Sequence, residues 1–342
     1  MNEPSPEAAL APWLAGPLRE LLTQRDRLHH ALLIHGPAGI GKSGLARHLA
    51  AGLFCEASID ALACGQCPSC GWMKSLAHPD LRLVIPEALD PDFVAPAGRK
   101  PSNEIRIEQI RALAGFTAVG GHRGGWRIVL IDPADAMNTV TANSLLKTLE
   151  EPGKDTLLML VTSHPDRLPA TIRSRCRSVG LRLPDPQACV GWLIAQGAAN
   201  RSTAEQALRA TGSPMHALGF IDPARLAAHQ AILEALSGLP ETMAIRVADL
   251  LERHDARQWA DVLQRWVSDL TRVRCGAAPY YFPDQRERMR TVVKHTDLDR
   301  LTALQQDLSS LGARIDHPLN ARLLCESSIF AYCEAFDAGR RA

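Results

Sequence analysis

The chain has 342 residues, and its 38 lysines and arginines against 37 aspartates and glutamates give a formal net charge of +1. This length allows more than one domain, each with its own core. The near-neutral charge gives no field that would draw the whole chain onto nucleic acid or a membrane, so any DNA contact must be local or shared with partners. Residues 1–6 contain no basic region followed by an apolar stretch, and we expect a cytoplasmic protein.

Strands and helices are predicted to alternate in the first half. Apolar runs predict buried parallel strands at 31–36, 81–85, 127–132 and 157–162. Helical spacing predicts helices at 42–54, 107–114 and 139–151. The last of these helices ends at Pro152, and its apolar residues, which we expect to be buried, are Val140, Leu145, Leu146 and Leu149. This alternation favours a doubly wound α/β layer.

A phosphate-binding loop is predicted at residues 36–43. The segment reads GPAGIGKS and fits the pattern G-x-x-x-x-G-K-[ST] between a predicted strand and a predicted helix, which is the context the motif requires. The glycines allow backbone N–H groups to surround phosphate oxygens, Lys42 would reach the terminal phosphates, and Ser43 would hold Mg²⁺. The residues predicted to bind ATP and Mg²⁺ here are Gly36, Gly39, Gly41, Lys42 and Ser43.

Four of the nine cysteines lie between residues 55 and 70, and they are Cys55, Cys64, Cys67 and Cys70. Without an export signal, this cluster indicates a metal site rather than disulfides. Four thiolates on a short, turn-rich loop suit a structural zinc ion with no open position for chemistry. An iron–sulfur cluster is the alternative, because C-x2-C-x2-C also occurs in ferredoxins. The ferredoxin sequences have a fourth cysteine three residues further on, followed by proline, whereas residues 77–79 of this chain contain the proline without the cysteine.

Asp132, at the end of the third predicted strand, is the natural second contact for Mg²⁺. P-loop motors usually have a glutamate next, which activates water. Pro133 occupies that position instead and cannot act as a base. Asp135 lies two residues further along, and its side chain is shorter than that of a glutamate. Positioning the attacking water is a separate requirement from binding phosphate. The sequence therefore allows a site that binds nucleotide without hydrolysing it.

Beyond about residue 180 the pattern becomes helical. One predicted helix buries Trp259, Val262, Leu263, Trp266, Val267 and Leu270, and a second buries Leu301, Leu304, Leu308 and Leu311. Proline-containing stretches at 183–186 and 221–223 are candidate domain boundaries. Periodicity alone leaves open whether these helices form an independent domain or an oligomerisation domain.

Four segments, HALLIHGPAGIGKS, NEIRIEQIR, NSLLKTLEEP and RSRCR, occur in this order, with the cysteine cluster inserted after the phosphate-loop helix. Together they resemble the bacterial clamp-loader AAA+ family over about the first 220 residues. The resemblance implies an α/β AAA+ P-loop domain at 1–180 with an inserted zinc module at 55–70. It further implies a small helical lid at 181–222 and an all-α collar at 223–342 that assembles with related subunits in a ring.

The resemblance also separates two kinds of subunit. The motor subunits, gamma and tau, carry a glutamate after the strand aspartate and an arginine in the Gly-Ser segment of the lid, where this chain has Pro133 and Met215. Both differences imply the stationary member. From spacing alone, the arginines of 173–177 would be a solvated surface. The family motif at 174–176 implies that Arg175 is an arginine finger, which completes a neighbouring motor subunit's ATP site in trans.

The partners that the resemblance implies are the gamma/tau and delta subunits in a hetero-oligomeric ring, the sliding clamp, and primed DNA through the complex. We expect no independent catalysis, although the chain would serve a DNA-directed DNA polymerase in replication. An ATP-hydrolysing motor subunit remains the alternative, because the phosphate loop is intact through Ser43. A DNA-reading zinc module is a third possibility, but only Lys74 lies nearby and there is no basic run.

Overall fold

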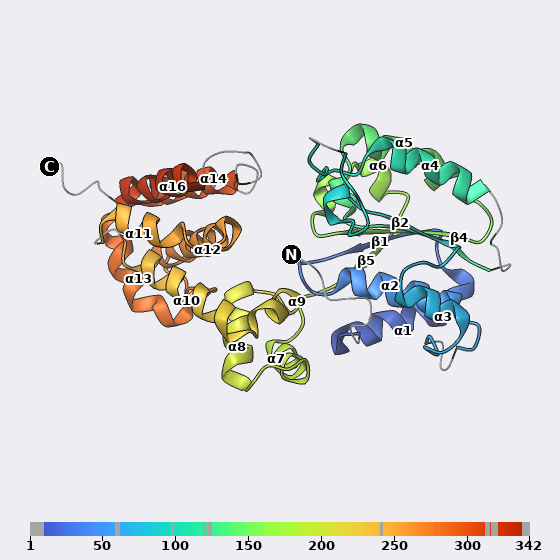
Figure 1. Cartoon of the computed structure of the whole chain (residues 1–342), viewed down its shortest axis with the longest axis horizontal. Helices are drawn as coiled ribbons and strands as arrows, with labels where there is room; N and C mark the ends of the chain where they lie inside the picture. Colours follow the sequence, from blue (N-terminus) through green and yellow to red (C-terminus); the bar gives the residue numbers. More distant parts are fainter. Residues whose placement is uncertain are drawn as a thin grey trace. The chain divides into compact units, whose positions relative to one another are not determined.

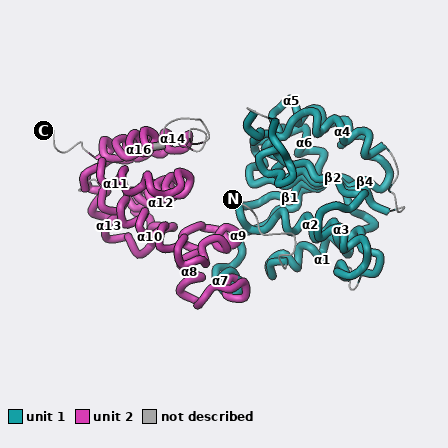
Figure 2. The backbone as a smooth tube through the Cα atoms, in the orientation of Figure 1, with its two compact units in different colours: residues 1–192 teal, residues 193–342 magenta. Residues whose placement is uncertain are grey.

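The computed structural model describes residues 10–58, 62–96, 99–118, 121, 125–239, 242–311, 315 and 321–336. The segment at 1–6, where we expected no export signal, lies outside the described residues. The chain divides into two compact units, 1–192 and 193–342 (Figure 2). Each unit is described by itself, and the predicted domain boundaries at 180 and 222 stay predictions.

The first unit is built on a five-stranded parallel sheet with the order β2-β3-β4-β1-β5. The strands are β1 (Ala31–His35), β2 (Leu81–Val84), β3 (Arg127–Ile131), β4 (Thr156–Thr162) and β5 (Arg177–Gly180). The four predicted strands are confirmed. The edge strand β5 was not predicted, because its sequence RSVG is short and alternates half-buried with exposed residues instead of forming an apolar run.

Helices cover both faces of this sheet (Figure 1), which confirms the α/β class. Strand residues alternate between the two faces, so Leu33, Val129 and Leu158 share a core with α4, α5 and α6, while α2 packs on β1 and β4 from the other side. The helices of this unit are α1 (Ala15–Thr23), α2 (Lys42–Phe54), α3 (Pro68–Lys74), α4 (Ile107–Ala118), α5 (Thr139–Glu150) and α6 (Ala170–Arg173). Helix α7 (Pro186–Ala195) begins in the first unit and ends in the second. Short 3-10 turns lie at η1 (Pro12–Leu14), η2 (Arg25–Arg27), η3 (Glu87–Leu89), η4 (Ala134–Ala136) and η5 (Pro165–Arg167).

Two residues of α5 are less buried than the sequence predicted: Val140 is exposed, and Leu146 is only partly buried against the core. We expected Val140 on the buried face, but its exposed fraction is 68%. Leu145 and Leu149 are buried as expected. Val140 precedes Leu145 by five positions, which at 3.6 residues per turn puts it well off the apolar face. The helix therefore buries a narrower stripe than the composition suggested.

The second unit contains no strand among its described residues, which confirms a helical carboxyl-terminal region. Its helices are α8 (Arg201–Thr211), α9 (Pro214–Ala217), α10 (Pro223–Ser237), α11 (Ala244–Leu251), α12 (Ala256–Arg274), α13 (Arg286–Val292), α14 (Leu298–Ser309) and α16 (Ala321–Phe336). Short 3-10 turns lie at η6 (Leu218–Phe220), η7 (Pro283–Gln285) and η8 (Val293–His295). All ten apolar residues predicted to line the two helices are buried, and α12 packs against α10, α13 and α14.

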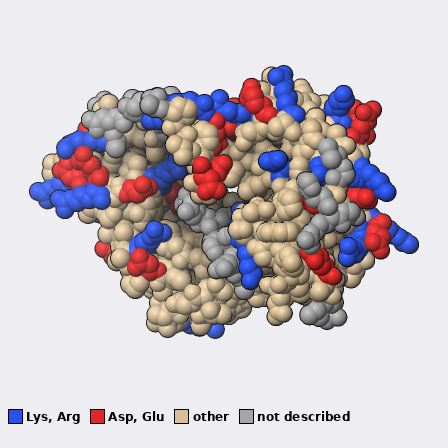
Figure 3. Space-filling view, turned by 45° about the vertical axis from the view of Figure 1, so that its right-hand side comes forward, with Lys and Arg blue, Asp and Glu red and all other residues tan. Residues whose placement is uncertain are grey.

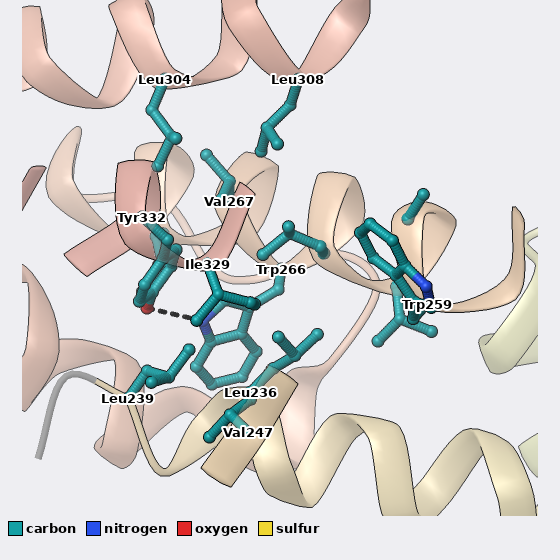
Figure 4. Packing of buried hydrophobic residues seen from close by; sticks show 14 of the residues in the cluster. Leu236, Leu239, Val247, Trp259, Trp266, Val267, Leu304, Leu308, Ile329 and Tyr332 are labelled. Atoms are coloured by element: carbon teal, nitrogen blue, oxygen red, sulfur yellow. Dashed lines mark hydrogen bonds between the residues drawn. The ribbon is translucent and has the colours of Figure 1, made fainter. Parts of the chain in front are cut away.

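Two polar contacts fix the centre of this core. The indole Nε1 of Trp266 donates to the hydroxyl of Tyr332 at 3.0 Å, and Figure 4 shows the pair among apolar side chains. Asp269, which is fully buried, accepts from the backbone N–H groups of residues 280, 281 and 282 at 2.7–2.8 Å. Because buried polar groups are costly without partners, these bonds specify how α12 meets α16 and the segment before η7.

Charges are mixed over the surface. On the face shown in Figure 3, basic and acidic side chains are interspersed, in keeping with the net charge of +1. None of the described helices combines the length and the apolar character needed to cross a bilayer.

The buried Trp266–Tyr332 bond yields a stability prediction. In Tyr332→Phe the indole N–H of Trp266 loses its acceptor while remaining buried, so the free energy of unfolding should fall by about 1–3 kcal/mol. Urea unfolding followed by circular dichroism measures this change. Tyr280→Phe is the matched control, because Tyr280 is 55% exposed and should tolerate the change. Equal effects of the two substitutions would contradict the importance of the buried bond.

Candidate functional site

The phosphate loop joins the end of β1 at His35 to the start of α2 at Lys42. Gly41 has a φ of 94° and is the residue before the first turn of α2, a backbone conformation that favours glycine. Gly36 has a φ of 150°, and a side chain there would overlap the backbone carbonyl of Leu181, just after β5. The loop is therefore packed directly onto the end of the neighbouring strand.

Lys42 lies inside this loop and is buried. Its ammonium donates to the carbonyls of Gly36 at 3.0 Å and Pro37 at 2.7 Å, and to the hydroxyl of Ser163 at 2.8 Å. Phosphate oxygens that bound here would compete with these acceptors. Ser163 follows β4, and the sequence reasoning missed it. The signal was available, since parallel strands end at one edge and Ser163 directly follows a predicted strand.

The acidic residues after β3 have different surroundings. Asp132 is half-buried, and its backbone N–H donates to the carbonyl of Val84 at 3.0 Å, which holds it at the same sheet edge as the loop. Asp135 accepts from the Thr162 hydroxyl, and that hydroxyl also accepts from the backbone N–H of His164 at 2.9 Å. The Asp135 carboxylate is therefore hydrogen-bonded to the last residue of β4. Pro133, between the two acids, offers no proton acceptor on its side chain.

Trp13 is a second residue that the sequence reasoning did not identify. Its indole Nε1 donates to the carbonyl of Ile40, within the loop, at 2.9 Å. The Trp13 ring meets the ring of Trp192 edge-on, with 5.3 Å between centroids. A segment from before β1 therefore holds the loop from outside. No periodicity or motif around Trp13 indicated this contact.

The four cysteines of the cluster come together as predicted. The sulfurs of Cys55, Cys64, Cys67 and Cys70 all lie within 4.8 Å of one another. The pairs Cys55–Cys67 and Cys64–Cys70 are 4.0 and 3.9 Å apart. A tetrahedron with metal–sulfur bonds of ~2.3 Å has edges of about 3.8 Å, so the four sulfurs fit a tetrahedral metal ion.

Backbone amides point at these sulfurs. The N–H groups of Cys64, Cys67 and Cys70 each donate to the preceding cysteine of the cluster, at 3.2–3.4 Å. Backbone hydrogen bonds lower the pKa of the Cys64 thiol to about 6, whereas burial raises the pKa of Cys70 to about 12. Backbone hydrogen bonds from the chain thus favour the thiolate form of Cys64, whereas burial disfavours it at Cys70.

The cysteine module is fastened to the end of α2. Phe54, the last residue of α2, stacks on His78 with ring centroids 3.8 Å apart, and Trp72 of α3 meets His78 edge-on. Ser69 donates to Glu56 at 2.7 Å across the module. Because α2 begins at the phosphate loop, the module supports the far end of the same helix.

Arg175 lies between α6 and β5. Its Nη2 is 2.6 Å from a carboxylate oxygen of Glu150, at the end of α5, and its Nη1 donates to the carbonyl of Thr171 at 3.0 Å. The side chain is 37% exposed. The next residue, Cys176, packs against the sheet core, where burial raises the pKa of its thiol to about 11. An inward cysteine thus anchors the chain beside an arginine that solvent can reach.

The sheet separates Arg175 from the phosphate loop of the same chain. Strand β5 runs parallel to β1, with Arg177 beside Leu32 and Gly180 beside His35. Arg175 precedes β5 and lies at its amino end, whereas the loop follows the carboxyl end of β1. The four residues of β5 span roughly 13 Å, so Arg175 and the loop are at opposite edges of the sheet.

Comparison with known proteins gives a consistent result. A family model described as "DNA polymerase III, delta subunit" matches residues 18–185. DNA polymerase III subunit delta' of Escherichia coli K12 is 30% identical over 308 residues, which cover 89% of each chain. The same subunit of Pseudomonas aeruginosa is 42% identical over 186 residues, 54% of this chain and 53% of that relative. The second alignment thus spans about half the length of its relative.

Among solved structures, a DNA polymerase III gamma subunit-related protein from Thermotoga maritima matches 93% of this chain and 99% of its own. The TM-score is 0.42 and the identity is 16%. The α/β fold itself is given by the parallel sheet and the helices on its two faces.

The packing of Gly36 on Leu181 yields a prediction. Gly36→Ala should lower the free energy of unfolding by about 1–3 kcal/mol, because the new methyl group overlaps a backbone carbonyl and the φ of Gly36 strains any side chain. Differential scanning calorimetry measures the shift. Gly44→Ala is the control, since Gly44 lies in α2 with open space around it, and this change should be neutral or stabilising. A Gly36 variant as stable as the wild type would contradict the described packing.

Proposed function

The chain belongs to the DNA polymerase III subunit delta' family, and we propose that it is the stationary subunit of a clamp loader, which donates Arg175 in trans to the ATP site of a neighbouring motor subunit. The observation that carries this proposal is the placement of Arg175 at the sheet edge opposite its own phosphate loop. An arginine at that edge is badly placed to serve its own loop. A guanidinium is permanently charged and bridges phosphate oxygens, so it suits a nucleotide bound next door.

The chain's own pocket is proposed to bind ATP and Mg²⁺ without turnover. Gly36, Gly39, Gly41, Lys42 and Ser43 would hold the phosphates and metal, with Asp132 as the second metal contact. When bound, the metal neutralises phosphate charge. Hydrolysis requires a group that positions water, and Pro133 supplies none. Asp135 is held by Thr162, which supports an idle site.

The proposed partners are the gamma/tau and delta subunits in a ring, the sliding clamp, and primed DNA reached through the complex. The second unit has its own helical core, and within it residues 223–342 would provide the collar. The proposed location of the protein is the cytoplasm. Met215 lies in α9 of that unit, where motor subunits would have the lid arginine. The mixed surface charge supports DNA contact through the assembled complex rather than by this chain alone.

We also propose that the metal of the cysteine cluster is zinc and that its role is structural. The sulfur spacing fits four-coordinate zinc, and four protein ligands leave no position open for a reactant. The module lies at the end of α2, so the metal would stabilise the helix that begins at the phosphate loop. Iron in a cluster is the alternative that metal analysis separates from zinc.

Metal analysis tests this assignment. The gently purified chain should contain one zinc ion per molecule. Cys70→Ser should contain almost none and should melt at a lower temperature, because a buried ligand is lost. Cys275→Ser is the control, since Cys275 is exposed and lies outside the cluster. Iron in the wild type, or no metal at all, would reject a zinc site.

The alternative function is an ATP-hydrolysing motor subunit, and the complete phosphate loop is the observation in its favour. The two functions differ in what the isolated chain does. A motor subunit would release phosphate steadily, and Lys42→Ala would abolish the release. A stationary subunit alone would release no phosphate, with or without Lys42→Ala. It would affect only the hydrolysis of a neighbour's nucleotide.

Arg175→Ala tests the main proposal in a loader reconstituted with motor and delta subunits from the same source. ATP turnover and clamp loading should fall about tenfold or more, because arginines supplied in trans raise turnover on the order of 10³–10⁵-fold at the site they complete. Turnover is followed as phosphate release, and assembly is checked by gel filtration.

Arg173→Ala is the matched control, because Arg173 lies in the same segment and its guanidinium is 3.5 Å from the exposed carboxylate of Asp166. This variant should retain normal rates. An Arg175→Ala loader that assembles and works like the wild type would reject the proposed role. Phosphate release by the isolated chain, lost in Lys42→Ala, would instead favour the motor function.

A further inference from the structure

We propose that Glu150 is a positioning residue that holds the Arg175 guanidinium in the geometry needed to reach a neighbouring triphosphate. This inference rests on the proposed function of Arg175. Glu150 is the last residue of α5, and Arg175 lies 25 positions later, beyond β4 and α6. The fold alone brings them together, and the ionic contact of 2.6 Å joins Nη2 to Oε1.

Two acceptors hold the guanidinium by its two terminal nitrogens. Glu150 binds Nη2, and the carbonyl of Thr171 binds Nη1 at 3.0 Å. Contacts at both nitrogens fix the plane of the group as well as its position. The remaining N–H donors of Arg175 then have a defined direction in which to meet phosphate oxygens. Thr171 contributes a backbone atom, so Glu150 is the contact that substitution can remove.

The long arginine side chain makes such a hold necessary. Arg175 is 37% exposed, so packing alone leaves it several rotamers, and holding a side chain of this kind in one of them costs conformational entropy. A finger held in place within its own subunit avoids most of this cost when the neighbour's nucleotide binds. Misplacement of a charged group by about 1 Å can lower a rate on the order of 10²-fold.

Helix stability does not explain a carboxylate at this position. Glu150 ends α5, where the helix dipole disfavours negative charge and favours a cation such as Lys147 in the same turn. An exposed ion pair also contributes little to folding, because water and salt screen the two charges. The contact with Arg175 explains a carboxylate at position 150, whereas the stability of α5 does not.

The adjacent acid provides a matched comparison. Glu151 is also exposed and follows directly in the sequence, so it experiences the same helix end. Within the described part of the chain, the structure pairs Arg175 with Glu150 and not with Glu151. Substitutions at the two positions therefore change charge equally, and only those at Glu150 release the guanidinium.

The experiment measures ATP turnover against ATP concentration in the reconstituted loader. Glu150→Ala should lower kcat about three- to tenfold with little change in KM, because nucleotide binding belongs to the motor subunit and the loss is one of orientation. Glu150→Gln retains an acceptor oxygen without the charge and should fall between Glu150→Ala and the wild type. Glu151→Gln should match the wild type. Melting temperature and assembly should be unchanged in every variant.

The double variant Glu150→Ala with Arg175→Ala separates positioning from other roles. It should have the rate of Arg175→Ala alone, since a positioning residue has nothing left to position. A further fall in the double variant would mean that Glu150 acts by another route and would overturn the inference. Wild-type rates in Glu150→Ala, beside a defective Arg175→Ala, would also overturn it while leaving the proposed function intact. Wild-type rates in both single variants would reject the proposed function itself.

Discussion

Parallel strands end at the same edge of a sheet, and here that rule decides which residues meet. The phosphate loop after β1, Asp132 after β3 and Ser163 after β4 follow three different strands and share the carboxyl edge. The same rule sends the segment before β5 to the amino edge, where Arg175 and the end of α5 lie. A single layer of strands therefore keeps the chain's own pocket apart from the arginine that it is proposed to lend.

Support for the two edges comes from different parts of the chain. At the carboxyl edge, Trp13 and Leu181 hold the loop from sequences that precede and follow most of the sheet. The cysteine module steadies the far end of α2 through Phe54 and His78. At the amino edge, the partly buried Cys176 packs against the core next to Arg175. The phosphate loop and Arg175 are thus each held in place by packing or backbone contacts of the residues beside them.

Local patterns predicted the parts of the site that are continuous in the sequence. The phosphate loop and the cysteine cluster are such patterns, because the residues that form each of them lie within one short segment, at 36–43 and 55–70. Ser163, Glu150 and Trp13 were missed, since each gains its role from a partner far away, at Lys42, Arg175 and Ile40. Sheet topology could have indicated Ser163. Glu150 and Trp13 require the packing itself. Edge strand β5 was missed because an exposed strand has no apolar run.

An intact phosphate loop does not by itself require turnover in this chain. The buried Lys42 ammonium joins two carbonyls of the loop to the hydroxyl of Ser163, and so it ties the end of β1 to the end of β4. Removing the lysine would take the shared donor from these three acceptors and would break the link between the two strand ends, whether or not nucleotide binds. Lys42 thus has a part in holding the loop together that is separate from its proposed part in binding phosphate. Pro133 has no part in these hydrogen bonds of Lys42, so the residue at that position can differ without disturbing them. A stationary subunit can therefore lose catalysis at one residue while the structure preserves the rest of the pocket.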